Sequence, residues 1–197
     1  MSARASTAVP LRVLLLVGSI RAGRFGHVPA AWAAERARER NDIALDVADL
    51  ADIRLPVVLP GDDEHAPVAN EVAMLGKRIQ AADAVVIVTP VYNRGYPASL
   101  KNAIDWFHDE WAATPVGFVS YGGMSGGIEA VEQLRGVFAE LRTMTIRNVL
   151  SFANFWERFD NGGQPVNADS ARAAATAFFD QLLWWARALR SARWEAA

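Results

Sequence analysis

Apolar runs alternate with amphipathic stretches along the whole chain, and this alternation predicts the fold class. Each of five strand-length apolar runs is followed, directly or after a loop, by a stretch with helical periodicity. The expected strands are Leu11–Val17, Ile43–Leu50, Ala84–Val88, Pro115–Tyr121 and Thr145–Leu150, and the expected helices span residues 27–40, 68–82, 97–111, 126–141 and 168–193. Such alternation produces right-handed crossovers, so we expect an α/β protein with one parallel sheet and helices on both faces.

The number and character of the strands narrow the topology. Five parallel strands in under 200 residues match a flavodoxin-like doubly wound sheet with the strand order 2-1-3-4-5. The run Leu11–Val17 is apolar at nearly every position, whereas Ile43–Leu50 alternates and is expected nearer an edge. Ligands of such sheets bind beyond the carboxyl ends of the strands, at the switch point between the first and third strands. The loops after the first, third and fourth strands are therefore the candidate site.

Length and composition are consistent with one folded unit. The 197 residues, of which 52% are hydrophobic, suffice for one sizeable core but not for two large domains. We therefore expect a single domain over residues 1–197. Within it, residues 1–10 are expected to form a flexible tail, and the proline-containing stretch Leu55–Pro67 a long surface loop.

Charge and residue types exclude several classes of function. The chain has 20 Lys and Arg against 22 Asp and Glu, and a net charge of −2 argues against nucleic acid or an anionic membrane as a partner. The absence of cysteine excludes disulfides, Cys-ligated metals and a cysteine nucleophile, so any redox chemistry requires a bound cofactor. The three histidines lack metal-ligand spacing, and no apolar run is long enough to span a bilayer. We expect a soluble cytoplasmic protein without a metal site.

The loop after the first strand has the composition of an anion-binding loop. It runs from Gly18 to His27 and contains three glycines, the hydroxyl of Ser19 and the guanidinium groups of Arg21 and Arg24. Glycines let backbone N–H groups approach an anion, and the following helix adds the positive end of its dipole. The pattern predicts a phosphate cradle, and the alternative is a simple strand-to-helix turn with solvated arginines.

Three kinds of phosphate cradle differ in their residues. A nucleotide-hydrolysing P-loop requires Lys and then Ser or Thr after its second glycine, but Arg24 and Phe25 occupy those positions. A dinucleotide fingerprint requires G-x-G-x-x-G, which Gly18, Gly23 and Gly26 do not supply. A nucleotide hydrolase is thus disfavoured, and a monophosphate such as that of FMN remains.

The other two loops are suited to a flat ring. After the third strand, Pro90 and Pro97 stiffen a connection that carries Tyr92 and Asn93. After the fourth strand, residues 120–127 are rich in glycine and offer backbone donors. A planar ring system can lie against peptide edges in both places.

These segments together carry a family resemblance. The motifs are Gly18–Ser19–x–Arg21, then Thr89–Pro90–x–Tyr92–Asn93 followed by Pro97 and by Leu100–Lys101–Asn102–Ala103–Ile104–Asp105–Trp106, and finally Ser120–Tyr121–Gly122–Gly123. In this order and spacing they resemble the NADPH-dependent FMN reductase family over about residues 11–160. The resemblance implies a flavodoxin-like enzyme that binds FMN. Such enzymes pass hydride from NADPH or NADH to free flavin, quinones, azo compounds or metal oxyanions.

The resemblance also implies roles for individual residues. Ser19 and Arg21 would be phosphate ligands, with Arg24, Gly26 and His27 beside them. One edge of the isoalloxazine would be lined by Pro90, Val91, Tyr92 and Asn93, and the other by Ser120, Tyr121, Gly122 and Gly123.

Two places depart from the family's pattern. Many members have Glu at the position of Val91, and many have Ser and Asn where this chain has Arg24 and Gly26. The first departure changes the electrostatics beside the ring. The second resembles a subset of the family with an arginine-glycine version of the loop.

The implied reaction requires little from side chains. Hydride moves from the nicotinamide C4 to the flavin N5 while the protein supplies stacking, orientation and hydrogen-bond donors. The backbone N–H groups of Gly122 and Gly123 are the candidates to meet the negative charge of the reduced ring, so no catalytic acid or base is assigned. One flavin site without a second nucleotide-binding unit predicts a ping-pong scheme.

Two choices stay open at this point. The preference for NADPH or NADH depends on whether a residue such as Arg94 meets the 2′-phosphate or is simply a solvated loop arginine. The alternative function is an FMN-binding electron carrier or sensor without turnover of its own. Carriers of that kind tend to be strongly acidic and to have a Ser/Thr-rich phosphate loop, and this chain has neither.

The helix expected over residues 168–193 has more apolar surface than one sheet face requires. The stripe that would face its own sheet consists of Phe178, Leu182, Trp185 and Leu189. The apolar residues outside such stripes are Phe179, Leu183 and Trp184 on this helix and Trp106 on the helix over 97–111. Excess apolar surface is typical of a partner site, so we expect a homodimer or homotetramer. The alternative is a wide stripe buried under residues 151–167.

The resemblance implies a flavin site beside the partner chain, with Phe155 and Trp156 reaching across.

Overall fold

A parallel sheet forms the centre of the fold. The computed structural model describes residues 9–60 and 69–195. Its strands are β1 (Leu11–Val17), β2 (Ile43–Asp49), β3 (Ala84–Pro90), β4 (Pro115–Gly122) and β5 (Met144–Ala153). Neighbouring strands pair in parallel in the order β2-β1-β3-β4-β5. This order confirms the flavodoxin-like doubly wound topology.

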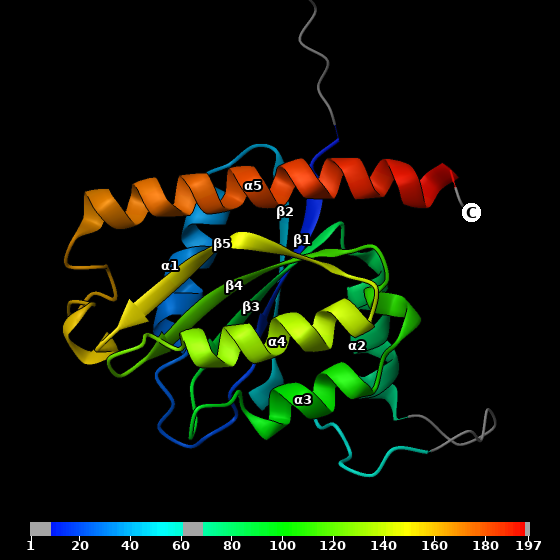
Figure 1. Ribbon diagram of the computed structural model, residues 1–197, viewed down its shortest axis with the longest axis horizontal. Helices are drawn as coiled ribbons and strands as arrows, with labels where there is room; N and C mark the ends of the chain where they lie inside the picture. Colours follow the sequence, from blue (N-terminus) through cyan, green and yellow to red (C-terminus); the bar gives the residue numbers. More distant parts are fainter. Residues whose placement is uncertain (1–8, 61–68, 196–197) are drawn as a thin grey trace, which may run out of the picture.

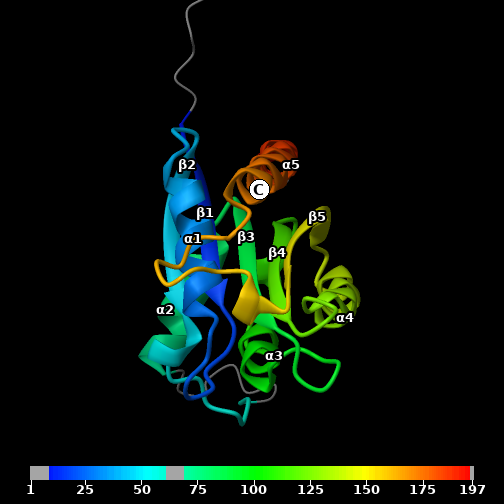
Figure 2. The same cartoon turned by 90° about the vertical axis from the view of Figure 1, so that its left-hand side faces the viewer.

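Helices cover both faces of this sheet (Figures 1 and 2). One face is covered by α1 (His27–Arg38) and α5 (Ala168–Glu195), and the other by α2 (Asn70–Ala81), α3 (Ala98–Asp105) and α4 (Ile128–Glu140). Because every crossover returns through a helix, the carboxyl ends of the strands lie along one edge of the sheet. In Figure 1 the loops after β1 (blue), β3 (green) and β4 (yellow-green) come together at the lower left. That edge contains the expected switch point.

The burial of each strand follows its position in the sheet. All residues of β3 and β4 are buried, whereas in β2 only Ile43 and Ala48 are. Alternate side chains of one strand enter different cores: Val13 packs under α1 and α5, and Leu14 packs on the other face. The expected edge position of β2 is confirmed.

The prediction of one helix over residues 97–111 is wrong in its second half. α3 ends at Asp105, and a separate 3₁₀ turn precedes β4. The Glu110 side chain accepts the backbone N–H of His108 at 3.2 Å, which takes that donor away from a helical hydrogen bond. The chain then turns, and Trp111 folds back into the core, where its indole N–H donates to a carbonyl oxygen of α3 at 3.2 Å.

Other boundaries differ by a few residues. β3 and β5 continue to Pro90 and Ala153, beyond the expected ends. α4 begins at Ile128, two residues later than expected, because Gly126 and Gly127 have φ angles of +63° and +88°. An α-helix requires negative φ. The glycine pair therefore belongs to the loop after β4.

α5 is buried more widely than expected. Phe179 and Leu183 are 1% and 0% exposed, so the expectation that they face a partner is wrong. The physical reason is that α5 packs on α1 as well as on the sheet, which buries two adjacent sides of the helix. Trp184 is 61% exposed, as expected. Trp106 is half-buried, and its indole N–H donates to the Pro56 carbonyl oxygen at 2.8 Å.

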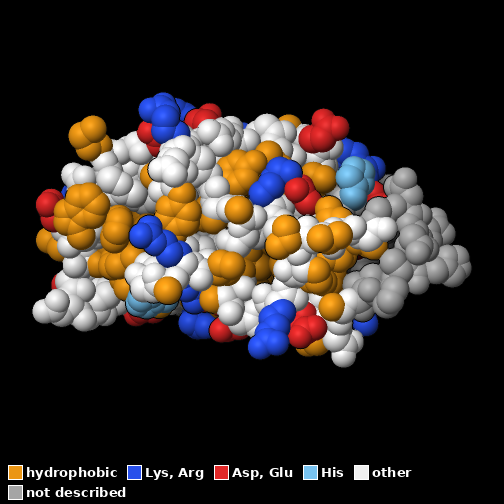
Figure 3. Space-filling model, turned by 90° about the horizontal axis from the view of Figure 1, so that it is seen from below, with side chains coloured by type: hydrophobic (Ala, Val, Ile, Leu, Met, Phe, Trp, Pro, Cys, Tyr) orange, Lys and Arg blue, Asp and Glu red, His pale blue; other side chains and the backbone are white. Residues whose placement is uncertain are grey.

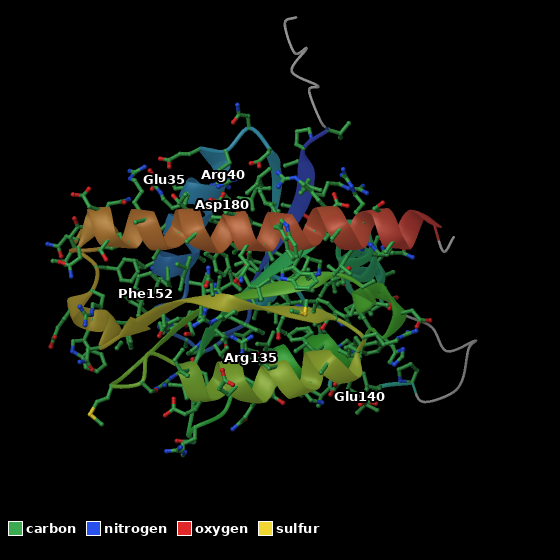
Figure 4. The ribbon with its side chains drawn as sticks, turned by 45° about the horizontal axis from the view of Figure 1, so that its top comes forward. Glu35, Arg40, Arg135, Glu140, Phe152 and Asp180 are labelled. Carbon is green, nitrogen blue, oxygen red and sulfur yellow. The ribbon has the colours of Figure 1, made fainter. Side chains whose placement is uncertain are left out.

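Arginines tie the outer helices to their neighbours. Figure 4 shows Arg40, which follows α1, beside Asp180 of α5, and Nη1 of Arg40 donates to Oδ1 of Asp180 at 2.8 Å. Arg135 of α4 lies against β5, where its Nη1 donates to the Ile146 carbonyl oxygen at 2.8 Å. These contacts join α1 to α5 and α4 to the edge strand.

Some expectations fall on residues outside the described ranges. Residues 1–8 include most of the expected tail, and residues 61–68 include much of the expected loop and the first residue of the helix expected over 68–82. The single domain over 1–197 stays a prediction. None of the described helices is both long and apolar enough to cross a membrane.

Candidate functional site

The loop between β1 and α1 is clamped where it leaves the sheet. The Gly18 N–H donates to the Val88 carbonyl oxygen at 2.9 Å, and Oγ of Ser99 donates to the Gly18 carbonyl oxygen at 2.6 Å. A Cβ added at Gly18 would lie only 3.2 Å from the Leu100 side chain. Glycine therefore lets the loop pass close to α3, and both peptide groups of this residue are held.

Ser19 and Tyr92 join the loops after β1 and β3. Ser19 is fully buried, and its hydroxyl lies 2.7 Å from Oη of Tyr92. The Arg21 N–H donates to Oγ of Ser19 at 3.4 Å, and the Arg21 guanidinium lies 5.8 Å from the centroid of the Tyr92 ring. Because Ser19 has no exposed surface, a direct contact between its hydroxyl and a ligand requires this loop to move.

The two arginines of the loop have different partners. Arg21 is exposed, and its guanidinium forms no ion pair with any described residue. Arg24 forms a two-pronged ion pair with Asp49, with Nη1 to Oδ1 at 2.8 Å and Nη2 to Oδ2 at 2.7 Å. The Arg24 carbonyl oxygen lies 3.1 Å from Nδ1 of His27. Arg21 is therefore the cation available to an anion, and Arg24 connects the loop to the end of β2.

The start of α1 adds backbone donors to the same loop. Gly26 is the N-cap residue of α1, and no side chain caps the helix there. In this first turn the Val28 N–H donates to the Phe25 carbonyl oxygen at 2.9 Å, and residue 29 is a proline without an N–H. The N–H of His27 and the positive end of the helix dipole therefore remain for an anion. Arg21 precedes this helix end by five residues. The loop thus combines a guanidinium that has no ion-pair partner among the described residues with the positive end of a helix dipole.

Two hydroxyl groups at the end of β4 are buried without a hydrogen-bond partner among the described residues. They are Oγ of Ser120 and Oη of Tyr121. A Cβ added at Gly26 would lie 2.7 Å from Oη of Tyr121, so this phenol lies directly against the N-terminus of α1. Burial raises the pKa of Tyr121, and the neighbouring Tyr92 adds to the rise, so the phenol stays protonated. The Tyr121 side chain lies at the phosphate loop, whereas its backbone belongs to the last residues of β4.

A short hairpin turn presents Asn93 and Arg94. Tyr92 and Gly95 exchange two backbone hydrogen bonds of 2.8 and 2.9 Å. The φ angles of Asn93 and Arg94 are +49° and +68°, as in a type I′ turn. Gln133 of α4 donates to the Arg94 carbonyl oxygen at 2.9 Å and holds the turn in place. Both side chains at the tip are exposed.

The loop after β4 is tightly packed except at Gly123. A Cβ added at Gly122 would lie 2.6 Å from the Val91 side chain, and one added at Gly126 would lie 2.9 Å from the backbone nitrogen of Ala153. A Cβ added at Gly123 would meet no atom within 4 Å. There is therefore open space beside the Gly123 backbone, where a ring could lie.

Comparisons with known proteins agree with this geometry. Residues 11–157 match the family of NADPH-dependent FMN reductases. The chain belongs to this family. It is 33% identical over 190 residues to a 2-hydroxy-1,4-benzoquinone reductase from a Burkholderia species, covering 90% of this chain and 97% of the relative. It is 36% identical over 154 residues to an NAD(P)H-dependent FMN reductase of Saccharomyces cerevisiae, covering 71% of this chain and 79% of the relative.

A solved structure supports the fold of this FMN reductase. The flavoenzyme NAD(P)H:(acceptor) oxidoreductase of Paracoccus denitrificans superposes with a TM-score of 0.70 at 24% identity, covering 87% of this chain and 97% of that one. The matching family is described as NADPH-dependent FMN reductases, and the yeast relative is named an NAD(P)H-dependent FMN reductase. The protein is therefore a flavin-dependent NAD(P)H oxidoreductase with FMN as its cofactor, and the enzyme is favoured over the electron carrier.

The residues of the site fit FMN. Arg21 is an exposed cation beside a helix N-terminus, which suits one phosphate group. At the same edge of the sheet, the buried hydroxyls of Ser120 and Tyr121 have no hydrogen-bond partner in the part of the chain that the structure describes, and the open space at Gly123 lies in the loop after β4. No group of three or more His, Asp or Glu side chains in residues 9–60 and 69–195 is placed to hold a metal ion. The donors and the space in this site therefore suit a flavin monophosphate.

Three residues that shape the loops were not singled out from the sequence. Asp49 pairs with Arg24, Ser99 holds Gly18, and Ser151 donates through Oγ to the Gly126 carbonyl oxygen at 3.1 Å. Their partners are 25, 81 and 25 residues away. Asp49 and Ser151 share one sequence signal, a place at the carboxyl end of an expected strand.

Proposed function

We propose that this FMN reductase binds one FMN across the loops after β1, β3 and β4, and that a small acceptor takes the reducing equivalents. The observation that carries the proposal is the connection of these three loops. The hydroxyls of Ser19 and Tyr92 are 2.7 Å apart, and the Val91 N–H donates to the Tyr121 carbonyl oxygen at 3.2 Å. One continuous surface at the switch point supports a single flavin site.

The proposed site has a phosphate end and a ring end. At the phosphate end, Arg21 and the first turn of α1 hold the phosphate within the loop formed by Ser19, Arg24, Gly26 and His27. At the ring end, Pro90, Val91, Tyr92 and Asn93 line one edge, and Ser120, Tyr121, Gly122 and Gly123 line the other. FMN supplies the hydride-accepting ring when bound. The chain itself orients that ring and offers N–H groups to the charge that develops on it.

We expect the acceptor to be a small quinone, flavin, azo compound or metal oxyanion. The names of the relatives support quinones most directly, since one is a 2-hydroxy-1,4-benzoquinone reductase and another a quinone reductase of Escherichia coli. The cytoplasmic location and the absence of nucleic-acid or membrane partners stay predictions from the sequence.

FMN is expected to bind more tightly than FAD, at about one FMN per chain. The β1–α1 loop offers one helix N-terminus and one guanidinium that pairs with no described carboxylate, which together match a single phosphate, and the sequence lacks a dinucleotide fingerprint. Titration of the flavin-free protein with each flavin, followed by fluorescence quenching, measures both dissociation constants. Tighter binding of FAD would contradict the proposed site.

Steady-state kinetics are expected to follow a ping-pong scheme. NAD(P)H and the acceptor would use the same space above one flavin, so the first product leaves before the acceptor enters. Initial rates are measured over a range of NADPH concentrations at several fixed concentrations of a benzoquinone. Plots of the reciprocal rate against the reciprocal NADPH concentration should give parallel lines, one for each benzoquinone concentration. Intersecting lines would show that both substrates bind together and would exclude this scheme.

A homodimer or homotetramer is also part of the proposal. Figure 3 shows apolar side chains (orange) in a band along the lower face, which includes α3 and α4 in Figure 1. Exposed apolar residues of the described chain include Val57, Val58 and Ile128, at 84%, 83% and 37% exposure. A contiguous apolar surface of this kind favours a partner. Phe155 packs 4.6 Å from Phe25 between ring centroids within its own chain, and Trp156 is 59% exposed. That Phe155 and Trp156 reach across to the flavin site of a partner stays a prediction.

Sedimentation equilibrium of the FMN-loaded protein at micromolar concentration tests the oligomeric state. The expected mass is that of two or four chains of 21.5 kDa. A monomer that still oxidises NADPH with a quinone would contradict the proposed assembly, because the apolar band would then be exposed in an active enzyme.

A further inference from the structure

The ion pair between Arg24 and Asp49 joins the phosphate loop to the edge of the sheet. Both guanidinium nitrogens of Arg24 donate to the carboxylate, at 2.8 and 2.7 Å. The side chains of Arg24 and Asp49 are only 18% and 20% exposed. Two-pronged pairs are the strongest and most directional contacts between arginine and a carboxylate, and partial burial reduces screening by solvent.

Asp49 is itself held in place. It is the last residue of β2 and pairs in register with Val17, the last residue of β1, so its backbone belongs to the sheet. Its Oδ1 also accepts the Ala51 N–H at 3.0 Å. The carboxylate is therefore a fixed anchor beside the root of the β1–α1 loop.

Through its ion pair with Asp49, Arg24 holds in place the part of the loop that would contact an anion. The Arg24 N–H donates to the Arg21 carbonyl oxygen at 3.1 Å and closes a turn, in which Gly23 has a φ of +69°. Holding Arg24 therefore holds the turn that carries Arg21 and the N–H groups that precede α1. A glycine-containing loop without such a brace loses conformational freedom when it binds a ligand, which weakens binding.

We infer that Asp49 is a positioning residue for the FMN phosphate, acting through Arg24. This inference rests on the proposed function, because it assumes that FMN binds in this loop. Asp49 has two opposing effects on a bound phosphate. Its charge repels the phosphate and occupies Arg24, whereas its ion pair preorganises the turn. The sheet-anchored geometry makes preorganisation the larger effect, since the repulsion comes from a carboxylate already neutralised by its partner.

The test compares FMN with riboflavin, which lacks the phosphate. Asp49→Asn is expected to raise the dissociation constant of FMN about tenfold and to leave that of riboflavin unchanged. The matched control is Asp46→Asn. Asp46 lies on the same strand and forms the same kind of pair with Arg78, at 2.8 and 2.7 Å, away from the loop. The control should change neither dissociation constant, and thermal unfolding of both flavin-free variants checks that they fold.

A second variant shows whether Asp49 acts through Arg24. Arg24→Gln should produce the same FMN-selective loss, and Asp49→Asn should add nothing in that background. If Asp49→Asn does not fold, the dissociation constants of FMN and riboflavin are compared on Arg24→Gln alone. The inference is overturned if Asp49→Asn tightens FMN binding, matches Asp46→Asn, or weakens both flavins equally. If the unsubstituted chain binds no FMN, the proposed function fails, and the inference fails with it.

Discussion

Arg21→Ala is expected to weaken FMN binding by about 1.5–3 kcal/mol, which raises the dissociation constant by roughly tenfold to more than a hundredfold. Arg21 is exposed, and its guanidinium has no carboxylate partner among the described residues. It is therefore the one cation of the β1–α1 loop free to pair with a phosphate, since Arg24 is committed to Asp49. The fold should not change, because Arg21 supports no buried contact.

Fluorescence quenching of FMN by the flavin-free variant measures this change. Arg38→Ala is the matched control, because Arg38 is an exposed arginine in the last turn of α1, far along the helix from the loop. It should leave FMN affinity unchanged. Equal affinities of the Arg21 variant and the control would remove Arg21 from the phosphate site.

Gly126→Ala is expected to lower the free energy of unfolding by about 2–5 kcal/mol and to abolish tight FMN binding. A φ of +63° costs a residue with a Cβ roughly 1–2 kcal/mol. The new Cβ would also lie 2.9 Å from the Ala153 nitrogen and 3.2 Å from the Phe152 carbonyl carbon. Both atoms are backbone of β5, so relief requires the loop to move, and overpacking of this kind costs about 1–3 kcal/mol.

The same displacement would disturb the ring end of the site. The Gly126 N–H donates to the Gly123 carbonyl oxygen at 3.1 Å, and the Asn154 N–H donates to the same oxygen at 2.8 Å. Gly136→Ala is the control, because Gly136 lies within α4 and an added Cβ would meet no atom within 4 Å. That change should raise stability by about 0.5–1 kcal/mol. Denaturant unfolding and FMN titration of both variants decide the prediction, and a Gly126 variant as stable as the Gly136 variant would refute it.

The order and type of the elements followed from hydrophobic periodicity. Continuous apolar runs predicted β1, β3 and β4, and the alternation in β2 predicted its edge position. Both patterns are local consequences of how many faces of a strand are covered, so a single sequence contains them. The glycines and prolines after these strands then predicted which loops form the site, because parallel strands end at a common edge.

The length of a helix could not be predicted from the sequence where a side chain takes a backbone hydrogen bond of that helix. The apolar spacing of Leu100, Ile104, Phe107 and Trp111 suits one long helix, and all four side chains are indeed buried. The helix nevertheless ends at Asp105, since Glu110 takes the His108 N–H and the indole of Trp111 finds its acceptor inside the core. Periodicity identifies which residues are buried but not whether one helix carries them.

The properties of the site's side chains were decided by tertiary contacts. Sequence spacing alone treats Arg21 and Arg24 as equivalent cations. Among the described residues only Arg24 pairs with a carboxylate, which comes from a strand residue 25 positions away. Likewise, the excess apolar surface of α5 predicted a partner, yet α1 covers Phe179 and Leu183. Local sequence patterns thus predict which residues form the site and that they lie at the carboxyl edge of the sheet. Which charge stays free, which hydroxyl is buried and which apolar face remains exposed depend on neighbours brought together only by the folded sheet, because pairing and burial are properties of distances in space.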